Sequence, residues 1–402
     1  MKLINKEMCC GCGACLNICS CNAISMEMDN EGFLYPEINT EKCVSCKKCA
    51  NVCPALNSKH ENPFYQEGYI VQHRDENILK ESTSGGAFTA IAEWVLDRKG
   101  IVFGAAFDEN WEVEHIAVEK KKDLERLRNS KYVQSRIGHT FQRANCELKK
   151  GRYVLFSGTP CQIEGLLNFL NCEYEKLITV DVVCRSVPSP GLWNKYISEM
   201  LNTIPDKVGK VKFRDKTHGY KYSTLSLRDN SGKIQYAEGV DTNPYLRAFF
   251  SNISVRPSCY QCQFKKRYRR SDFTIWDCYN TYDFDRKMDD NRGTSRVLIH
   301  TSKGVGVFDE VKKKINYLQI EPSKLIVGVR EMTDSVENNI NRDYFFKDYQ
   351  YMTALELLDK YYPISLKTRL EKCIRIVCVR IGIYGTAIRI YKKCFKKERI
   401  RR

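Results

Sequence analysis

The order of apolar and polar residues after residue 67 predicts strands and helices that alternate along the chain. Residues 87–98 carry apolar side chains at helical spacing, with Phe88, Ile91 and Val95 on the expected buried face. Five short apolar runs have the length and composition of strands: 68–73, 101–107, 113–118, 153–156 and 177–183. A second helix pattern runs from the loop after 153–156 to Leu170. Strand, tight loop and helix in succession favour an α/β core with some parallel pairing.

Near the C-terminus, apolar residues recur at alternating steps of four and three. They are Leu370, Ile374, Val377, Ile381, Tyr384, Ile388, Tyr391 and Phe395. Lys and Arg stand between them, so the pattern predicts an amphipathic basic helix. Insertion of this segment across a bilayer is near break-even. Its eight Ile or Val between 374 and 390 favour insertion by about 2 to 5 kcal/mol, whereas Arg380 alone costs about 2.5 to 3.5 kcal/mol. The helix is therefore expected to lie on an anionic membrane surface, or to dock on the protein or a partner subunit.

Eight cysteines before residue 54 follow one spacing twice. They are Cys9, Cys12, Cys15 and Cys19, then Cys43, Cys46, Cys49 and Cys53, each set reading C-x2-C-x2-C-x3-C. This spacing is typical of a bacterial ferredoxin with two [4Fe-4S] clusters, in which the fourth cysteine of each run ligates the other cluster. We expect Cys53 to complete the first cluster and Cys19 the second. Structural zinc is the alternative, but zinc sites use separated C-x2-C pairs, and the triple runs would leave some thiolates without a metal.

Two further cysteines, Cys10 and Cys21, lie beside these ligands but outside the spacing. We interpret both as small buried hydrophobic residues rather than ligands.

Composition and length show that the ferredoxin is only part of the protein. A chain of 402 residues with 43% hydrophobic and 28% charged residues is expected to form two or three globular domains. The net charge is +16, of which residues 367–402 carry +11, with 13 Lys or Arg against 2 Asp or Glu. Cluster ligands need reducing surroundings, and no apolar signal segment precedes Cys9, so we expect a cytoplasmic protein.

Two loops that open helices are candidates for binding a cofactor. They contain Ser84, Gly85 and Gly86, and Ser157, Gly158 and Thr159. Such loops direct backbone N–H groups and the positive end of a helix dipole at a phosphate or a flavin oxygen. The alternative is an ordinary helix start with a tight turn.

Four later cysteines form a second group. Cys161 and Cys184 each follow a predicted strand, and Cys259 and Cys262 form a C-x2-C pair. Four thiolates are the number that a cubane or a structural zinc requires, so a third cluster, a zinc site and unrelated core thiols all remain open.

The run at residues 265–270 contains five Lys or Arg and one Tyr. Cations with an aromatic residue can bind nucleic acid, but no nucleic-acid-binding motif accompanies them. We expect a solvated loop or a clamp for a small anion such as the pyrophosphate of FAD.

Eight motifs in fixed order give the chain a family resemblance. They are ESTSGGAF, SKYVQS, VLFSGTPCQIEGL, DVVCRSVPSPGLW, FRDKTHGY, RPSCYQCQFK, SDFTIWD and MDDNRGTS. Over residues 68–304 the chain resembles the beta subunit family of coenzyme F420 hydrogenases and dehydrogenases. The resemblance implies an FAD-binding subunit with a [4Fe-4S] cluster held by Cys161, Cys184, Cys259 and Cys262, which passes electrons to the deazaflavin coenzyme in archaeal members. Lys131, in SKYVQS, joins the candidate cofactor contacts.

With this resemblance the expected organisation is of mixed α+β and α/β class. A ferredoxin domain at 1–57 and a polar linker at 57–63 precede a flavin-binding-like core, in two parts at 64–145 and 146–330. The third cluster belongs to the second part, and residues 331–402 form the helical basic tail.

The chain departs from the family at two places. Arg185 and Ser186 stand where members usually carry histidine and glycine, and residues 276–280 (WDCYN) replace a Gly-Asp-Phe-Trp-Gly type segment. The lost glycines remove backbone freedom and space beside the expected flavin. Cys278, within this segment, is interpreted as a core thiol, with a ligand role as the alternative.

Two functions follow. The first is an oxidoreductase that moves electrons between its clusters, FAD and an anionic organic acceptor or donor, with no catalytic side chain assigned. The second is a non-catalytic electron-transfer or assembly subunit, docked to a partner or membrane complex through its tail.

Overall fold

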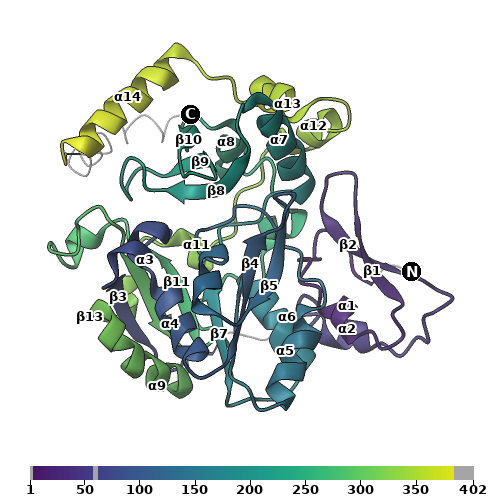
Figure 1. The fold of residues 1–402 in the computed structure, drawn as a ribbon. Helices are drawn as coiled ribbons and strands as arrows, with labels where there is room; N and C mark the ends of the chain where they lie inside the picture. Colours follow the sequence, from purple (N-terminus) through teal and green to yellow (C-terminus); the bar gives the residue numbers. More distant parts are fainter. Residues whose placement is uncertain (1–2, 58–61, 384–402) are drawn as a thin grey trace.

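The computed structural model describes residues 3–57 and 62–383 of the chain (Figure 1). Its largest element is an eight-stranded sheet with the order β13-β3-β12-β11-β7-β6-β4-β5. In chain order the strands are β3 (Glu67–His73), β4 (Ile101–Phe107), β5 (Val113–Val118), β6 (Val154–Gly158), β7 (Leu177–Val182), β11 (Phe273–Asp277), β12 (Ser295–Ile299) and β13 (Ile315–Ile320). The four inner strands β4, β6, β7 and β11 run parallel, so their carboxyl ends meet at one edge.

Helices cover both faces of this sheet. On one face lie α4 (Ala87–Leu96) and α9 (Ser302–Val311), and on the other α5 (Thr140–Lys149) and α6 (Pro160–Leu170). Along β4, Val102 packs under α4 whereas Phe103 packs under α5, because successive strand residues point to opposite faces. Both faces are apolar, as a doubly covered parallel sheet requires.

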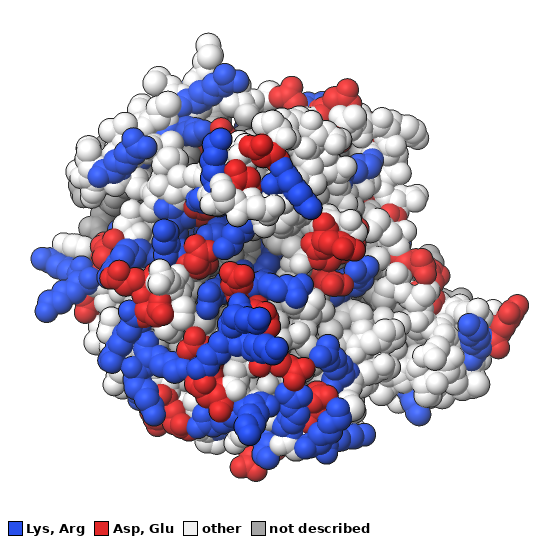
Figure 2. All heavy atoms as spheres, in the orientation of Figure 1, with Lys and Arg blue, Asp and Glu red and all other residues white. Residues whose placement is uncertain are grey.

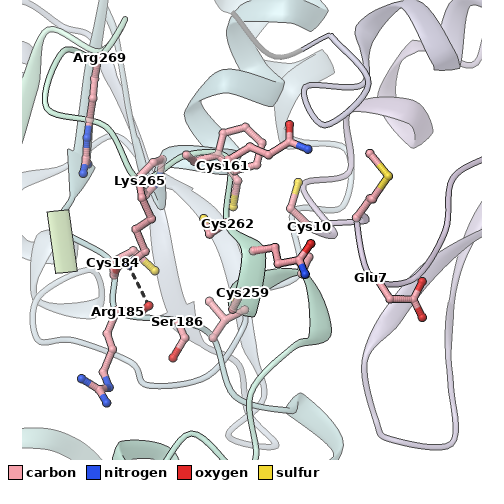
Figure 3. Close-up of a pocket in the computed structure, with 17 residues that line it drawn as sticks. Glu7, Cys10, Cys161, Cys184, Arg185, Ser186, Cys259, Cys262, Lys265 and Arg269 are labelled. Carbon is pink, nitrogen blue, oxygen red and sulfur yellow. Dashed lines mark hydrogen bonds between the residues drawn. The ribbon is translucent and has the colours of Figure 1, made fainter. Parts of the chain in front are cut away.

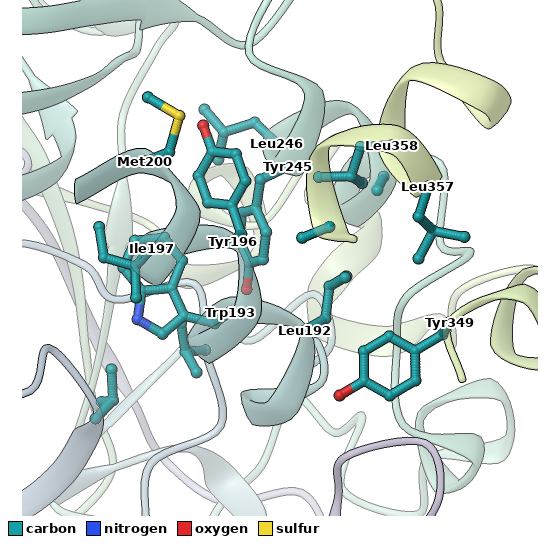
Figure 4. Packing of buried hydrophobic residues seen from close by; sticks show 14 of the residues in the cluster. Leu192, Trp193, Tyr196, Ile197, Met200, Tyr245, Leu246, Tyr349, Leu357 and Leu358 are labelled. Carbon is teal, nitrogen blue, oxygen red and sulfur yellow. The ribbon is translucent and has the colours of Figure 1, made fainter. Parts of the chain in front are cut away.

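A second unit stands at the carboxyl edge of the sheet. It contains the antiparallel strands β8 (Val208–Asp215), β9 (Thr224–Asp229) and β10 (Ile234–Gly239), with the helices α7 (Pro190–Thr203), α8 (Pro244–Phe250), α12 (Arg342–Asp348) and α13 (Ala354–Tyr361). Its core is aromatic: Trp193, Tyr196 and Tyr245 are fully buried and pack against Leu357 and Leu358 of α13 (Figure 4). This packing fixes β8 above the loops that carry the candidate cofactor residues.

The ferredoxin domain pairs β1 (Ile24–Met28) with β2 (Leu34–Ile38) and places α1 (Ala14–Ile18) beside α2 (Lys48–Val52). It packs on α6, where an added Cβ at Gly165 would lie 2.9 Å from Cys12 Sγ. The absence of a side chain at Gly165 therefore lets a cluster cysteine reach the surface of the α/β core.

The remaining helices are α3 (Glu76–Glu81), α10 (Pro322–Leu325), α11 (Arg330–Thr333) and α14 (Leu366–Arg380). Short 3-10 turns form at η1 (Lys121–Arg126), η2 (Pro257–Gln261), η3 (Thr281–Asp283) and η4 (Lys312–Lys314). Within 3–57 and 62–383, no helix combines the length and the apolar character needed to cross a bilayer.

The mixed α/β class, the five predicted strands, the helix from residue 87 and the helix ending at Leu170 are confirmed. The buried face of α4 was predicted too narrowly, since Ala90, Ile91, Ala92 and Val95 are buried together whereas Phe88 is only partly so. The basic helix is confirmed as α14, while Tyr384, Ile388, Tyr391 and Phe395 lie outside the described residues. Most of the predicted 57–63 linker also lies outside them.

Candidate functional site

The cysteines expected at the first cluster lie at the inner end of the ferredoxin domain. Cys9, Cys12, Cys15 and Cys53 are all buried, whereas Cys46 of the second set is exposed and Cys19, Cys43 and Cys49 are half-buried. Burial, with the charges of Cys9 and Cys53, raises the pKa of Cys15 to about 12. Such a thiol ionises near neutral pH only when a metal shares its charge, which fits iron ligation.

A buried guanidinium joins this cluster site to the α/β core. Arg256 is fully buried, donates through Nε to the carbonyl of Cys9 at 2.6 Å, and has Nη2 3.6 Å from Cys9 Sγ. It also donates to the Leu34 carbonyl at 3.0 Å and to Gln134 Oε1 at 2.8 Å. None of these four contacts is with a carboxylate, so the charge of Arg256 is directed at the cysteine that should carry a cluster.

Gly11 makes this close approach possible. Its φ is +66°, and an added Cβ would lie 2.6 Å from Gln134 Nε2 and 2.9 Å from Arg256 Nη1. Only glycine combines that backbone conformation with the absence of a side chain.

We expect Gly11→Ala to destabilise the folded protein by the left-handed strain of about 1 to 2 kcal/mol plus about 1 to 3 kcal/mol of overpacking. Gly138→Ala is a matched control, because Gly138 also has a positive φ but no atom within 4 Å of the added Cβ. Denaturant unfolding of the two holoproteins measures the difference. Equal losses of stability would contradict the contact argument.

The four later cysteines line one cavity of about 200 Å³ (Figure 3). Cys161 is the second residue of α6, directly after β6, and Cys184 follows the neighbouring parallel strand β7, so both lie at the carboxyl edge of the sheet. The turn η2 carries Cys259 and is followed by Cys262. The backbone N–H of Arg256 donates a hydrogen bond of 2.9 Å to the carbonyl of Val187, which brings that turn beside the segment after Cys184.

The chemistry of this cavity suits a metal cluster. Burial raises the pKa of Cys184 to about 12, and it also raises the pKa of Cys259 and Cys262. Ser186 and Arg269 are among the residues that line the cavity, and Ser186 Oγ and Arg269 Nη2 are buried without a hydrogen-bond partner among the described residues. Thiols that need a metal to ionise, beside unpaired donors that can bind sulfide, are what a [4Fe-4S] cluster would use.

The described part of the chain contains no group of three His, Cys, Asp or Glu side chains drawn together as ligands of a single ion. The cysteines of this cavity are thus spread around its wall.

Sequence reasoning missed the position of Cys10. Cys10 is buried as expected, but it also lines the cavity with the four later cysteines. Its thiol is hydrogen-bonded to both Cys12 and Cys161. The bond with Cys12, together with burial, raises the pKa of Cys10 well above its usual value, and the bond with Cys161 opposes that shift. The cavity of the four later cysteines therefore begins at the residue next to the expected ferredoxin ligand Cys9. Spacing along the chain cannot reveal that the two sites are so close.

Cys278 lies away from this cavity. It is fully buried in a small cluster with Ile70, Met288 and Leu325, and Arg296 Nε lies 3.5 Å from its sulfur. This environment is that of a core thiol.

The basic run at 265–270 is largely engaged inside the protein. Lys265 donates to the carbonyls of Cys184, Arg185 and Glu331, Arg269 forms a buried ion pair with Asp181 at 2.8 Å, and Arg270 pairs with Glu164 at 2.9 Å. The expectation of a solvated loop is wrong for these three residues. Lys265 and Arg269 are bonded to the segment after β7 and to β7 itself, and Arg270 is paired with α6.

The candidate cofactor loops adjoin one another. Thr83 Oγ1 accepts from the backbone N–H of Ser130 at 2.8 Å, which places the 84–86 loop beside Lys131. His115 Nε2 lies 2.9 Å from the carbonyl oxygen of Ser157 and feels the charge of Lys131. Thr159 Oγ1 in turn lies 3.2 Å from Cys161 Sγ. The seven candidate cofactor residues therefore form one region that reaches the cysteine cavity.

Two side chains in this region are poised for a ligand, the half-buried Lys131 and the buried His115. Lys131 Nζ donates to the carbonyls of Arg126 and Arg128, both at 2.9 Å, and burial lowers its pKa to about 7. Burial and the Lys131 charge lower the pKa of His115 to about 4, so this ring is neutral and donates through Nε2. Its Nδ1 is then a buried acceptor with no donor among the described residues. An anionic ligand with N–H or O–H groups would satisfy both.

The 84–86 loop also has a structural role. The N–H of Gly85 donates to Ser295 Oγ at 2.8 Å, and an added Cβ there would lie 2.1 Å from the carbonyl oxygen of Val71. Gly86, with φ +80°, starts α4. The Gly85 N–H is thus engaged with β12 rather than directed at a ligand.

Cations surround these loops. Lys216 of the β8–β9 loop donates to the carbonyls of Leu79, Ser84 and Arg292, and burial lowers its pKa to about 7. Arg214 of β8 donates to Tyr132 Oη at 3.0 Å, but its charge is paired with Asp277 at 2.8 Å. Figure 2 shows many Lys and Arg over the half of this face that contains α3, α4 and β8, with Asp and Glu among them. Lys131 and Lys216 donate to carbonyl oxygens, so these two side chains are the ones that favour an anion.

Comparisons with known proteins identify the family of the chain. For the beta subunit of coenzyme F420 hydrogenase/dehydrogenase, the C-terminal family model matches residues 151–324 and the N-terminal family model matches 69–140. A 4Fe-4S dicluster domain matches residues 8–57. Among solved structures, a chain of the F420-reducing [NiFe] hydrogenase complex from Methanosarcina barkeri is similar, with 14% identity and a TM-score of 0.43 over 77% of this chain and 97% of that chain.

Proposed function

Since the chain belongs to the coenzyme F420 hydrogenase/dehydrogenase beta subunit family and carries a 4Fe-4S dicluster domain, we propose that this iron-sulfur oxidoreductase-type subunit relays electrons between [4Fe-4S] clusters, FAD and an anionic organic molecule. When bound, FAD would exchange single electrons with iron-sulfur clusters and electron pairs with an organic partner. The chain's own residues hold these groups in order and set the charge around each.

One observation carries the proposal: the candidate sites are contiguous. Cys10, next to the buried ferredoxin cysteine Cys9, is hydrogen-bonded to Cys161. Thr159 Oγ1 lies 3.2 Å from Cys161 Sγ. Ser157 of the same loop contacts His115, which is close enough to Lys131 to feel its charge. Cys46, of the second ferredoxin set, is exposed to solvent. This order supports exchange with a redox partner protein at the second ferredoxin cluster and with the organic molecule at the Lys131 region.

The residues of each site have distinct tasks. We assign the third cluster to Cys161, Cys184, Cys259 and Cys262, with Ser186 and Arg269 as donors to it. For FAD, Lys131 would neutralise negative charge, while His115 Nδ1 would accept a hydrogen bond. The thiol chemistry further supports a reducing compartment, and we propose the cytoplasm.

Flavin content tests the proposal. Protein purified without oxygen should be brown and contain about one FAD per chain, and anaerobic titration with the reduced deazaflavin should bleach flavin and cluster bands together. Protein that has all its clusters and takes up no FAD would overturn the proposal that the chain is an oxidoreductase.

The second candidate function, a non-catalytic electron-transfer or assembly subunit, is favoured by the 276–280 segment. Trp276 and Asn280 stand at the two glycine positions of the family segment. The ring of Trp276 packs on the apolar cluster that contains Cys278, and Asn280 Oδ1 accepts from Arg296 Nη2, so both side chains occupy space that glycines would leave open. Full clusters without flavin uptake would support this function.

The pKa of Lys131 gives a pH prediction. An ammonium with a pKa of about 7 attracts an anion below that pH and loses its charge above it. We expect FAD affinity to fall about tenfold between about pH 6 and pH 8.5. Fluorescence titration of flavin-depleted protein measures this, and Lys131→Arg is the control, because arginine stays charged throughout. The same pH dependence in Lys131→Gln would show that another group titrates.

A further inference from the structure

We propose that α14 is a membrane-binding surface that holds one face of the protein against an anionic lipid bilayer. The inference rests on the orientation of the helix and is independent of the redox function. In Figure 1 this helix lies along the outside of the β8–β10 sheet, at the edge of the molecule.

The helix is attached to the protein largely through polar side chains. Lys372 donates to Glu238 Oε2 at 2.6 Å, and Arg375 donates to Asp241 Oδ1 at 2.5 Å. Both acids belong to β10 and the turn that follows it. Val379 is buried on the same side. The two ion pairs fix the rotation of the helix about its axis.

Its apolar stripe consequently faces outward. Leu366, Leu370, Ile374, Val377 and Ile381 are each more than half exposed, at 54% to 83%. Their steps of three and four residues place them in one line along the helix. A helix of a globular protein normally turns such a stripe toward the core. Here the usual orientation is reversed, and a contiguous exposed apolar patch marks a binding surface.

The charge beside the stripe identifies its partner. Lys367 and Arg369 at the start of the helix and Arg380 at its end are exposed. A line of large apolar side chains between cations matches the boundary between acyl chains and anionic headgroups. The helix would lie flat in this boundary, consistent with its 15 residues, which are too few to span a bilayer.

Vesicle co-sedimentation of the full-length holoprotein tests the surface. The probes are vesicles of phosphatidylcholine alone and of phosphatidylcholine with one third phosphatidylglycerol. We expect binding to the anionic vesicles that weakens with salt, and at least tenfold weaker binding for the Ile374→Glu, Val377→Glu double variant. Substituting Lys367 or Arg369 with Gln should weaken binding about fivefold each.

Val327→Glu with Ile340→Glu is the matched control, since both residues are exposed apolar side chains away from α14. It should bind like the unmodified protein, and equal iron content should verify that every variant is folded. Absence of binding to anionic vesicles, or equal binding by the Ile374→Glu, Val377→Glu variant, would overturn the proposal. So would a dimer, seen by light scattering, that this variant abolishes, because the stripe would then join two copies of the chain.

Discussion

Replacing Arg256 with Gln should lower the midpoint potential of the buried ferredoxin cluster by about 100 mV. A cluster gains negative charge on reduction, and a nearby cation stabilises that state. A unit charge about 6 Å away contributes about 3 kcal/mol at an effective dielectric constant of 20, which corresponds to roughly 100 mV for one electron. Arg256 is the group in that position, because its Nη2 lies 3.6 Å from Cys9 Sγ. An EPR-monitored redox titration measures the shift.

Arg342 provides a control for the loss of domain contact. It is also buried and also bonds the ferredoxin, donating to Glu31 Oε1 at 2.8 Å, but its charge is paired with that carboxylate. Arg342→Gln should loosen the ferredoxin while leaving the potential near its original value. Arg256→Lys keeps the charge and should recover part of the shift. If both glutamine variants moved the potential equally, docking rather than charge would be the cause.

Replacing Cys259 and Cys262 with Ser should remove about four of about twelve irons per chain, because three cubanes each contain four. Two of four ligands would be lost from a cavity whose remaining thiols, Cys161 and Cys184, cannot hold a cubane alone. Iron and acid-labile sulfide assays, with EPR of the reduced protein, measure the loss. The ferredoxin signals should persist, since their ligands lie in another domain.

Cys278→Ser is the matched control, because this buried cysteine belongs to a separate apolar cluster. It should keep all the irons. Retention of about twelve irons by the double variant would refute the third site, and loss of all of them would show that the sites fold as one unit.

Local sequence was sufficient for the elements whose signals are local. Strands such as β4 and β7 and the helices α4 and α6 follow from short apolar runs and from the residues that start helices. The cysteine spacing likewise predicted the iron-sulfur domain that the dicluster match confirms. Each of these signals lies within the segment that it describes.

Contacts between distant residues could not be predicted in this way. The sequence around Cys10 indicates a core thiol. Only the packing of α1 against α6 brings this residue to the cavity that contains Cys161. The run at 265–270 has the sequence of a surface loop, yet Arg269 is buried because Asp181, 88 positions earlier, lies opposite it. Neither partner is encoded near the residue that it pairs with.

The amphipathic tail shows which properties follow from local sequence and which follow from tertiary packing. The sequence alone predicted a helix with an apolar stripe and basic neighbours from Leu370 onward, because helical periodicity is a property of the segment itself, and the part of it up to Arg380 is described as α14. It also determined the ligand spacing of the ferredoxin. Only the tertiary structure decided that the stripe faces outward, that Arg256 lies against Cys9, and that the two candidate cofactor loops and Lys131 form one region, of which Thr159 contacts Cys161. Each of these depends on which surfaces come together when the chain packs, and that is a property of the whole fold.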